Sequence, residues 1–135
     1  MADFKKAYTR TAVFEGGYTN DPDDNGNWTG GAKGMGTLVG SNDGIAAPVL
    51  AKYLGRVPTV ADMKNISKET VENIYRKSYW NPIRGDEIIS QDEANQIYDT
   101  AVNMGVGTAI KLATRALQLQ EKTVMDNTVL NKLNA

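Results

Sequence analysis

Four carboxylates stand close together near the start of the chain: Glu15, Asp21, Asp23 and Asp24. Glu15 ends a segment with helical periodicity, and Gly16-Gly17 follows at once as a helix stop. A carboxylate at a helix C-terminus faces the negative end of the helix dipole, which favours its protonated form and raises its pKa. A carboxylate in the polar loop that follows should stay ionised. One protonated acid beside one charged partner is the arrangement that glycoside hydrolysis uses.

Two simpler interpretations of this segment stay open. A stretch rich in Asp, Asn, Gly and Pro forms ordinary turns, and a double glycine is an ordinary helix end. The loop oxygens could also bind calcium, although the segment lacks the order of an EF-hand loop with its closing glutamate. Catalysis by carboxylates is favoured over both once the rest of the chain is considered.

The run from Glu15 to Asp24 resembles the signature Glu-Gly-Gly-Tyr-x-Asn-Asp-Pro-x-Asp of the glycoside hydrolase family 108 muramidases. Three further segments resemble motifs of that family, in the same order along the chain. They are 41–45 (Ser-Asn-Asp-Gly-Ile), 74–81 (Ile-Tyr-Arg-Lys-Ser-Tyr-Trp-Asn) and 98–105 (Tyr-Asp-Thr-Ala-Val-Asn-Met-Gly). Four ordered motifs make the resemblance specific.

That family consists of lysozyme-like enzymes of phages, prophages and bacterial secretion systems. The resemblance implies a mainly helical, lysozyme-like single domain over residues 1–135, with a small β-hairpin in a glycine-rich loop after the first helix. It implies an N-acetylmuramidase that cleaves the β-1,4 bond between N-acetylmuramic acid and N-acetylglucosamine in bacterial peptidoglycan. Glu15 would be the general acid. Asp24 matches the last aspartate of the motif and is assigned as its ionised partner.

The hydroxyl partner is where the chain departs from the family. The usual pattern runs Gly-Gly-x-Thr-x-x-Gly-Ile, but here an insert, Gly30–Gly40, separates Gly26-Asn27-Trp28-Thr29 from the later Gly-Ile pair. Counting forward from Asp24 points to Thr29, and counting back from the Gly-Ile pair points to Ser41. We prefer Thr29 by spacing. The insert itself is either a flap over the sugar cleft or a longer hairpin.

Five residues are further candidates for contact with the sugar chain: Tyr18, Ser41, Trp80, Asp99 and Asn103. Trp80 closes a predicted helix beside Tyr79, where it either stacks on a sugar or packs in the core. Asp99 and Asn103 are four residues apart and share one face of a predicted helix. They either line the cleft or bond back to the glycine-rich loop. Tyr18 forms either a cleft wall or a cap over the first helix.

The composition narrows the chemistry further. The chain has 135 residues, enough for one domain with one core, and 15 basic against 16 acidic residues leave a formal charge of −1. The chain therefore lacks the excess of positive charge that binds nucleic acid or an anionic membrane. Without cysteine there is no disulfide or thiol chemistry, and without histidine there is no serine–histidine triad. Hydrolysis would therefore run on carboxylates, without a metal or another cofactor.

Residues 1–20 contain no apolar run long enough for a signal peptide or a membrane span. We therefore expect a soluble monomer made in the cytoplasm. A holin or a dedicated secretion system would then deliver it to peptidoglycan in the periplasm and cell wall.

Periodicity and capping residues predict the helices. The expected ranges are 2–15, 45–54, 59–64, 68–79, about 91–104, 107–119 and a short last helix to about 134. Ser67, Ser90 and Asp126 are the expected N-caps, and Pro82 should stop the fourth of these helices. Apolar residues around much of 107–119 predict a central, mostly buried helix. Trp28-Thr29 and Thr37–Val39 predict the small hairpin.

Two competing functions remain open. A lytic transglycosylase cuts the same bond with one essential glutamate and no hydrolytic water, and the presence of Asp24 argues against it. A degenerate peptidoglycan-binding module would explain the insert and the displaced hydroxyl.

Overall fold

The computed structural model describes residues 1–11 and 17–135, so Glu15 and the predicted helix end beside it lie outside the described residues. The contacts of the chain divide it into two compact units. Unit 1 is Met1–Ala12 with Tyr75–Ala135, and unit 2 is Val13–Ile74. The single domain expected from the length stays a prediction.

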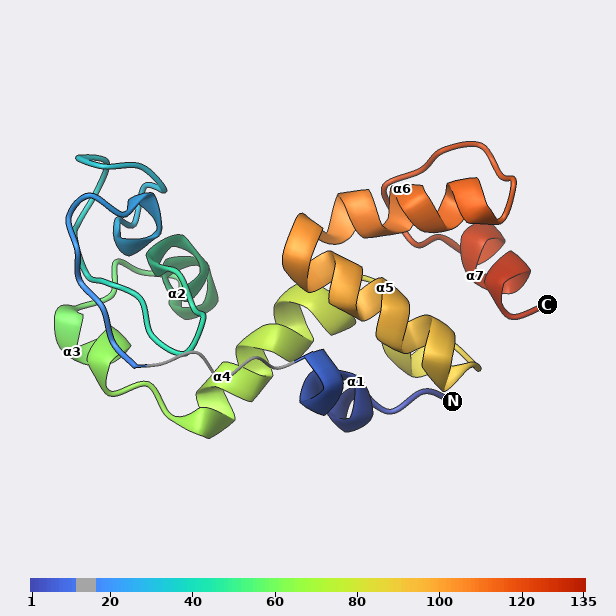
Figure 1. Cartoon of the computed structure of the whole chain (residues 1–135), viewed down its shortest axis with the longest axis horizontal. Helices are drawn as coiled ribbons and strands as arrows, with labels where there is room; N and C mark the ends of the chain where they lie inside the picture. Colours follow the sequence, from blue (N-terminus) through green and yellow to red (C-terminus); the bar gives the residue numbers. More distant parts are fainter. Residues whose placement is uncertain (12–16) are drawn as a thin grey trace. The chain divides into compact units, whose positions relative to one another are not determined.

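Unit 1 is built from helices around one apolar core. Its elements are α1 (Phe4–Thr11), the π-helix η2 (Arg76–Trp80), the 3₁₀-helix η3 (Gly85–Glu87), α5 (Gln91–Met104), α6 (Val106–Ala116) and α7 (Asn127–Leu133). In Figure 1, α5 runs between α1 and α6. Phe4 from α1, Trp80 from η2 and Tyr98 from α5 meet in the core with ring centroids 5.7–5.9 Å apart. None of the helices within the described ranges is both long and apolar enough to cross a bilayer.

Local capping chemistry sets the predicted ends of these helices. The Ser90 hydroxyl accepts the N–H of Glu93 at 3.2 Å and opens α5. Asp126 accepts the N–H of Val129 at 2.9 Å and opens α7. Each bond satisfies one of the amide groups that have no partner inside the helix. Both N-caps are confirmed.

The prediction that 107–119 forms a mostly buried helix is wrong. In α6, Ala109, Ile110 and Thr114 are buried, whereas Leu112 is 40% exposed and Arg115 is exposed. The helix packs one face against α5, and its other face is solvated. Apolar residues on much of a helix circumference do not require that the whole helix is buried, since much protein surface is apolar.

Unit 2 combines short helices with a glycine-rich segment. It contains the 3₁₀-helix η1 (Asn25–Asn27), α2 (Ala47–Leu54), α3 (Val60–Lys64) and most of α4 (Lys68–Tyr75). Gly55 ends α2 in the left-handed region with φ +71°, a conformation that glycine adopts without strain. Thr59 and Asp62 form a reciprocal capping box at α3.

The helix predicted over 68–79 changes its character midway. Ser67 opens α4 as expected, because its hydroxyl accepts the N–H of Thr70 at 3.0 Å. After Tyr75 the chain continues as η2, and the N–H of Asn81 bonds to the Arg76 carbonyl oxygen at 2.8 Å. This five-residue hydrogen-bond step widens the turn that ends in Trp80.

The predicted hairpin is present as one short β-bridge, and a second bridge lies outside the two predicted pieces. Trp28 pairs antiparallel with Leu38, and Thr19 pairs antiparallel with Ser41. The N–H of Thr29 donates to the Thr37 carbonyl oxygen at 2.9 Å, continuing the ladder toward the tip. The mainly helical class with one small β-element is confirmed. The insert is a hairpin in its local structure.

Candidate functional site

The loop that carries the aspartates is folded into two consecutive turns. Asp21 accepts the N–H of Asp23 on its side chain at 2.9 Å and the N–H of Asp24 on its backbone oxygen at 3.1 Å. Asp24 is the N-cap of η1, and its carboxylate accepts the N–H of Gly26 at 3.0 Å. These are the bonds that aspartate side chains make to stabilise turns. They hold the exposed Asp24 carboxylate in one place.

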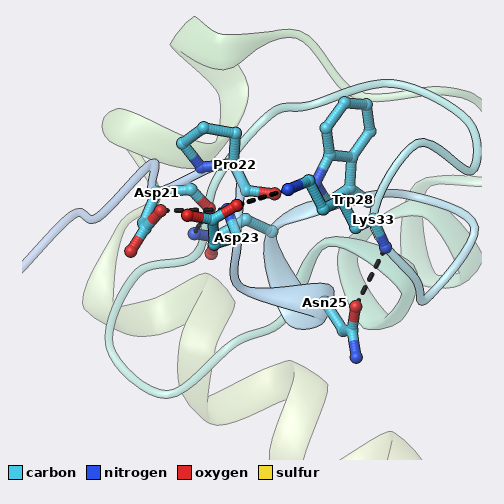
Figure 2. Close-up of polar contacts among 7 residues, drawn as sticks. Asp21, Pro22, Asp23, Asn25, Trp28 and Lys33 are labelled. Atoms are coloured by element: carbon cyan, nitrogen blue, oxygen red, sulfur yellow. Dashed lines mark hydrogen bonds and ion pairs between the residues drawn. The ribbon is translucent and has the colours of Figure 1, made fainter.

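The hairpin tip folds back onto this loop. Lys33 forms an ion pair with Asp23 at 2.5 Å, and its backbone N–H donates to the Asn25 side-chain oxygen at 2.9 Å. Figure 2 shows the second of these bonds and the turn formed by Asp21, Pro22 and Asp23. The ion pair is exposed and therefore contributes little stability. The ion pair neutralises the charge of Asp23 only. Asp24 has no ion pair among the described residues.

The three aspartates do not converge as metal ligands. Asp21 bonds to a backbone amide, Asp23 pairs with Lys33, and Asp24 caps η1. Over residues 1–11 and 17–135, no group of three or more Asp, Glu, His or Cys side chains is arranged to hold a metal ion. Each of the three carboxylates thus already has a partner within the loop.

A buried amide connects the aspartate turns to the hairpin. Asn27 is fully buried, and its side-chain N–H donates to the Asp21 carbonyl oxygen at 2.9 Å. Its backbone oxygen accepts the N–H groups of Val39 and Gly40, both at 3.0 Å. Its side-chain oxygen has no hydrogen-bond partner in the described part of the chain. Asn27 stands where the family pattern has its second glycine, so this connection belongs to this chain's own version of the loop.

The two candidate hydroxyls both lie in unit 2, and both are engaged. Thr29 accepts the N–H of Thr37 on its hydroxyl oxygen at 2.8 Å, which leaves its own proton available to another acceptor. The Ser41 hydroxyl lies 3.2 Å from the Thr19 hydroxyl in the second β-bridge. Thr29 belongs to the hairpin that follows η1, and Ser41 belongs to the bridge with Thr19.

Tyr18 is tied to the hairpin. Its hydroxyl donates to the Val39 carbonyl oxygen at 2.9 Å, and its ring lies against Gly40, where an added Cβ would come within 2.7 Å of the ring. The Lys64 ammonium is 6.0 Å from the ring centroid. The half-buried ring forms part of the surface of unit 2.

Trp80 is not placed to stack on a sugar. Its side chain is fully buried, its indole N–H donates to Asp86 at 2.9 Å, and its ring packs against Phe4 and Tyr98. Trp80 therefore packs in the core, and the prediction that it contacts the substrate is wrong. Its neighbour Tyr79 is half-buried, and burial raises the pKa of the Tyr79 hydroxyl.

Asp99 and Asn103 lie together on α5 in unit 1. The Thr11 hydroxyl donates to the Asp99 carboxylate at 3.1 Å, joining the last residue of α1 to α5. The Asn103 amide donates to the Asp99 backbone oxygen at 2.8 Å. The shared face is confirmed by this contact. Asp99 thus anchors the last residue of α1, which stands four positions before Glu15 in the sequence.

The sequence interpretation missed three contributors to the loop: Asn27, Trp28 and Lys33. The departure of Asn27 from the Gly-Gly pattern was the available signal. For Trp28 the sequence predicts only a place in a strand. The side chain is partly exposed, and its indole N–H donates to the Pro22 carbonyl oxygen at 2.8 Å (Figure 2). Nothing local in the sequence pairs Lys33 with Asp23, because that contact depends on the hairpin folding back.

Comparisons with known proteins agree with the motifs. The family model described as Glycosyl hydrolase 108 matches residues 8–105. No curated protein matches. Among solved structures, the chain is similar to SagA from Brucella abortus, with 26% sequence identity and a TM-score of 0.74. The match covers 96% of this chain and 67% of the SagA chain. The expected mainly helical, lysozyme-like fold class is confirmed. The chain belongs to glycoside hydrolase family 108, and the function that this membership supports is that of a peptidoglycan glycosidase.

Proposed function

We propose that this protein is an N-acetylmuramidase that hydrolyses the β-1,4 bond between N-acetylmuramic acid and N-acetylglucosamine. The observation that carries the proposal is the state of the Asp24 loop. Asp24 is exposed, oriented by the Gly26 N–H, and without an ion pair among the described residues, whereas its neighbour Asp23 is paired with Lys33. Asp21 is likewise exposed, held by the Asp23 N–H and without an ion pair among the described residues, and we choose Asp24 because it matches the last aspartate of the family motif.

In this mechanism Glu15 donates a proton to the leaving glycosidic oxygen. Positive charge then develops on the sugar ring, and the carboxylate of Asp24 stabilises it or activates the attacking water. A separation of about 5 Å between the two carboxyl groups would favour retention at the anomeric carbon, and roughly 6.5–9.5 Å would favour inversion. The chain has no histidine, so carboxyl groups must carry both proton-transfer roles.

We propose Thr29 as the hydroxyl partner. Its oxygen is occupied by the Thr37 N–H, which directs its proton toward a further acceptor such as water or a sugar oxygen. Ser41 remains the competing candidate, and its hydroxyl already has that of Thr19 as a neighbour. Tyr18, Asp99 and Asn103 are proposed to support substrate binding.

The test is hydrolysis of purified peptidoglycan, followed by turbidity and by mass spectrometry of the soluble products. Reducing muramic ends support the muramidase, and anhydro-muramic ends would identify a lytic transglycosylase instead. The Glu15→Gln variant should lose lysis, because the amide cannot supply the proton. The matched control is Glu69→Gln on the exposed first turn of α4, which should lyse normally. Binding without lysis by the unmodified protein would favour the binding-module alternative.

For delivery, we propose that a holin or a secretion system carries the protein to the cell wall, where it acts as a monomer on peptidoglycan. Expression in the cytoplasm with and without a co-expressed holin tests this. Lysis only in the presence of the holin is expected, and equally fast lysis without it would contradict the proposal.

A further inference from the structure

The two tryptophans of the chain occupy opposite environments. Trp80 is fully buried in unit 1. Trp28 is partly exposed and belongs to the loop that carries Asp24 in unit 2. A partly exposed indole contributes less to stability than a fully buried one, and its exposed part is available for contact with a ligand.

Trp28 is held rigidly at both its backbone and its side chain. It is the C-cap of η1, with its N–H on the Asn25 carbonyl oxygen at 3.3 Å, and its own carbonyl accepts the Gly31 N–H at 2.9 Å. The β-bridge to Leu38 fixes it from the other strand. Its indole N–H donates to the Pro22 carbonyl oxygen at 2.8 Å, and in Figure 2 the six-membered ring extends away from that contact. The indole N–H is therefore satisfied within the loop, and the part of the ring that stays exposed can make other contacts.

The short helix η1 separates the backbone of Trp28 from that of Asp24. Asp24 is the N-cap of η1 and Trp28 is its C-cap. Four residues at the rise of a 3₁₀-helix span roughly 8 Å along the axis. This backbone spacing is short enough for a single glycan strand to contact both residues.

We propose that Trp28 is a stacking platform for one pyranose ring of the glycan strand. The face of an indole carries negative quadrupole charge, and one face of a pyranose presents weakly positive C–H groups, so the two attract. Because the ring is already held by Pro22 and its backbone by the bridge to Leu38, stacking costs little side-chain entropy. This inference rests on the proposed function for the identity of the sugar. The sequence predicts only a strand at Trp28, whereas this inference gives Trp28 a contact that determines specificity for the sugar.

Binding can be followed separately from cleavage. The probe is a soluble tetrasaccharide of alternating N-acetylglucosamine and N-acetylmuramic acid, added to the Glu15→Gln variant so that it stays intact, which mass spectrometry verifies. Acrylamide quenches exposed tryptophan, so quenching reports Trp28 in preference to the buried Trp80. The tetrasaccharide should protect the fluorescence in a saturable manner, with the midpoint that calorimetry gives for binding.

Variants then separate stacking from loop support. Trp28→Leu should raise the Kd of the tetrasaccharide by about tenfold, whereas Trp28→Phe, which keeps an aromatic face, should raise it much less. Met35→Ala removes an exposed apolar side chain from the same hairpin and should leave the Kd unchanged. Circular dichroism and thermal melting of each variant verify that the fold is retained.

Several outcomes would overturn the proposal. These are an unchanged Kd in Trp28→Leu, equal losses in the Leu and Phe variants, or calorimetric binding with no change in quenching. Tetrasaccharide binding at Trp28 together with no lysis by the unmodified protein would support the platform and defeat the proposed hydrolase. No tetrasaccharide binding at all would defeat the platform, even if lysis of whole peptidoglycan supported the hydrolase.

Discussion

The side-chain amide of Asn27 donates to the backbone oxygen of Asp21 at 2.9 Å from a fully buried position. The backbone oxygen of the same Asn27 accepts the N–H groups of Val39 and Gly40 at 3.0 Å. One residue thus joins the aspartate turns to the returning strand of the hairpin. A buried polar group with a partner on each side makes the relative position of two segments well defined, because losing either partner leaves an amide or carbonyl unsatisfied.

The Asn27→Asp variant tests this connection through pH. The new carboxyl replaces the donor with an acceptor facing the Asp21 carbonyl, and burial raises its folded pKa above its unfolded value. Stability should therefore fall by about 3 kcal/mol at pH 7 and recover partly near pH 4, where the protonated carboxyl can donate to Asp21. Urea unfolding at both pH values measures the effect.

Asn25→Asp is the matched control for that experiment. Asn25 is exposed in the same turn, and its side-chain oxygen accepts the Lys33 N–H, a bond that a carboxylate can also accept. This variant should change stability by less than about 0.5 kcal/mol at either pH. Equal behaviour of the two variants would contradict the structural role given to Asn27.

Asp24→Asn should lower turnover strongly while leaving the loop intact. The amide oxygen can still accept the Gly26 N–H, so the cap is kept and only the charge is lost. Loss of one electrostatic contact of this kind costs about 100-fold in kcat. Steady-state cleavage of a soluble muropeptide oligomer gives kcat and KM separately.

Asp21→Asn serves as the comparison for Asp24→Asn. Asp21 uses its side chain to accept the Asp23 N–H, which an asparagine can also do, so this variant should retain most activity. A larger loss of kcat in Asp21→Asn than in Asp24→Asn would show that Asp24 is the wrong partner for Glu15.

Gly85→Ala should destabilise the protein by about 1–3 kcal/mol through overpacking. A Cβ at Gly85 would lie 2.2 Å from the Trp80 ring, which is fully buried and cannot move aside freely. The control is Gly107→Ala on α6, where a Cβ would meet Thr123 at an ordinary 3.6 Å. That variant should be neutral or stabilise by up to about 1 kcal/mol, because alanine favours a helix over glycine. The urea unfolding midpoint of each variant, at an unchanged m-value, measures its change in stability. Similar destabilisation in Gly85→Ala and Gly107→Ala would argue against tight packing at Trp80.

Asp62 should make the protein less stable at acid pH. The hydrogen bond from Arg56 at 2.7 Å, and then that from the Thr59 N–H at 2.9 Å, lower the pKa of Asp62 from 3.8 to about 2. The folded state therefore binds its proton less readily than the unfolded state. This contribution to stability is present above pH 3.8 and is lost as the pH falls through about 2. In calorimetric melting, the Tm of Asp62→Asn should be lower than that of the unmodified protein at neutral pH. This difference in Tm should shrink as the pH approaches 2.

The control for Asp62→Asn is Asp92→Asn, an exposed carboxylate on the first turn of α5. Its difference in Tm from the unmodified protein at neutral pH should be smaller than that of Asp62→Asn, because no ion pair of Asp92 is found among the described residues. A gap between Asp62→Asn and the unmodified protein that stays constant from pH 7 to pH 2 would show that the contact with Arg56 has no effect on stability.

The sequence by itself determined the features that depend on neighbouring residues. Ser90, Asp126 and Gly55 set helix ends, because caps and left-handed turns form within a few residues of chain. The hairpin from Trp28 to Leu38 followed from turn residues between two short apolar pieces. The four ordered motifs likewise predicted the family, because residue types in a fixed order can be read without a structure.

Only the tertiary structure decided which of these side chains are buried. Trp80 packs against Phe4, 76 positions earlier in the sequence, and one face of α6 stays in solvent although its residues are largely apolar. The Asn27 amide and the Lys33–Asp23 pair form because the hairpin returns to the aspartate turns. Burial and pairing of this kind depend on contacts between distant segments, whose free energy is not encoded in any local pattern.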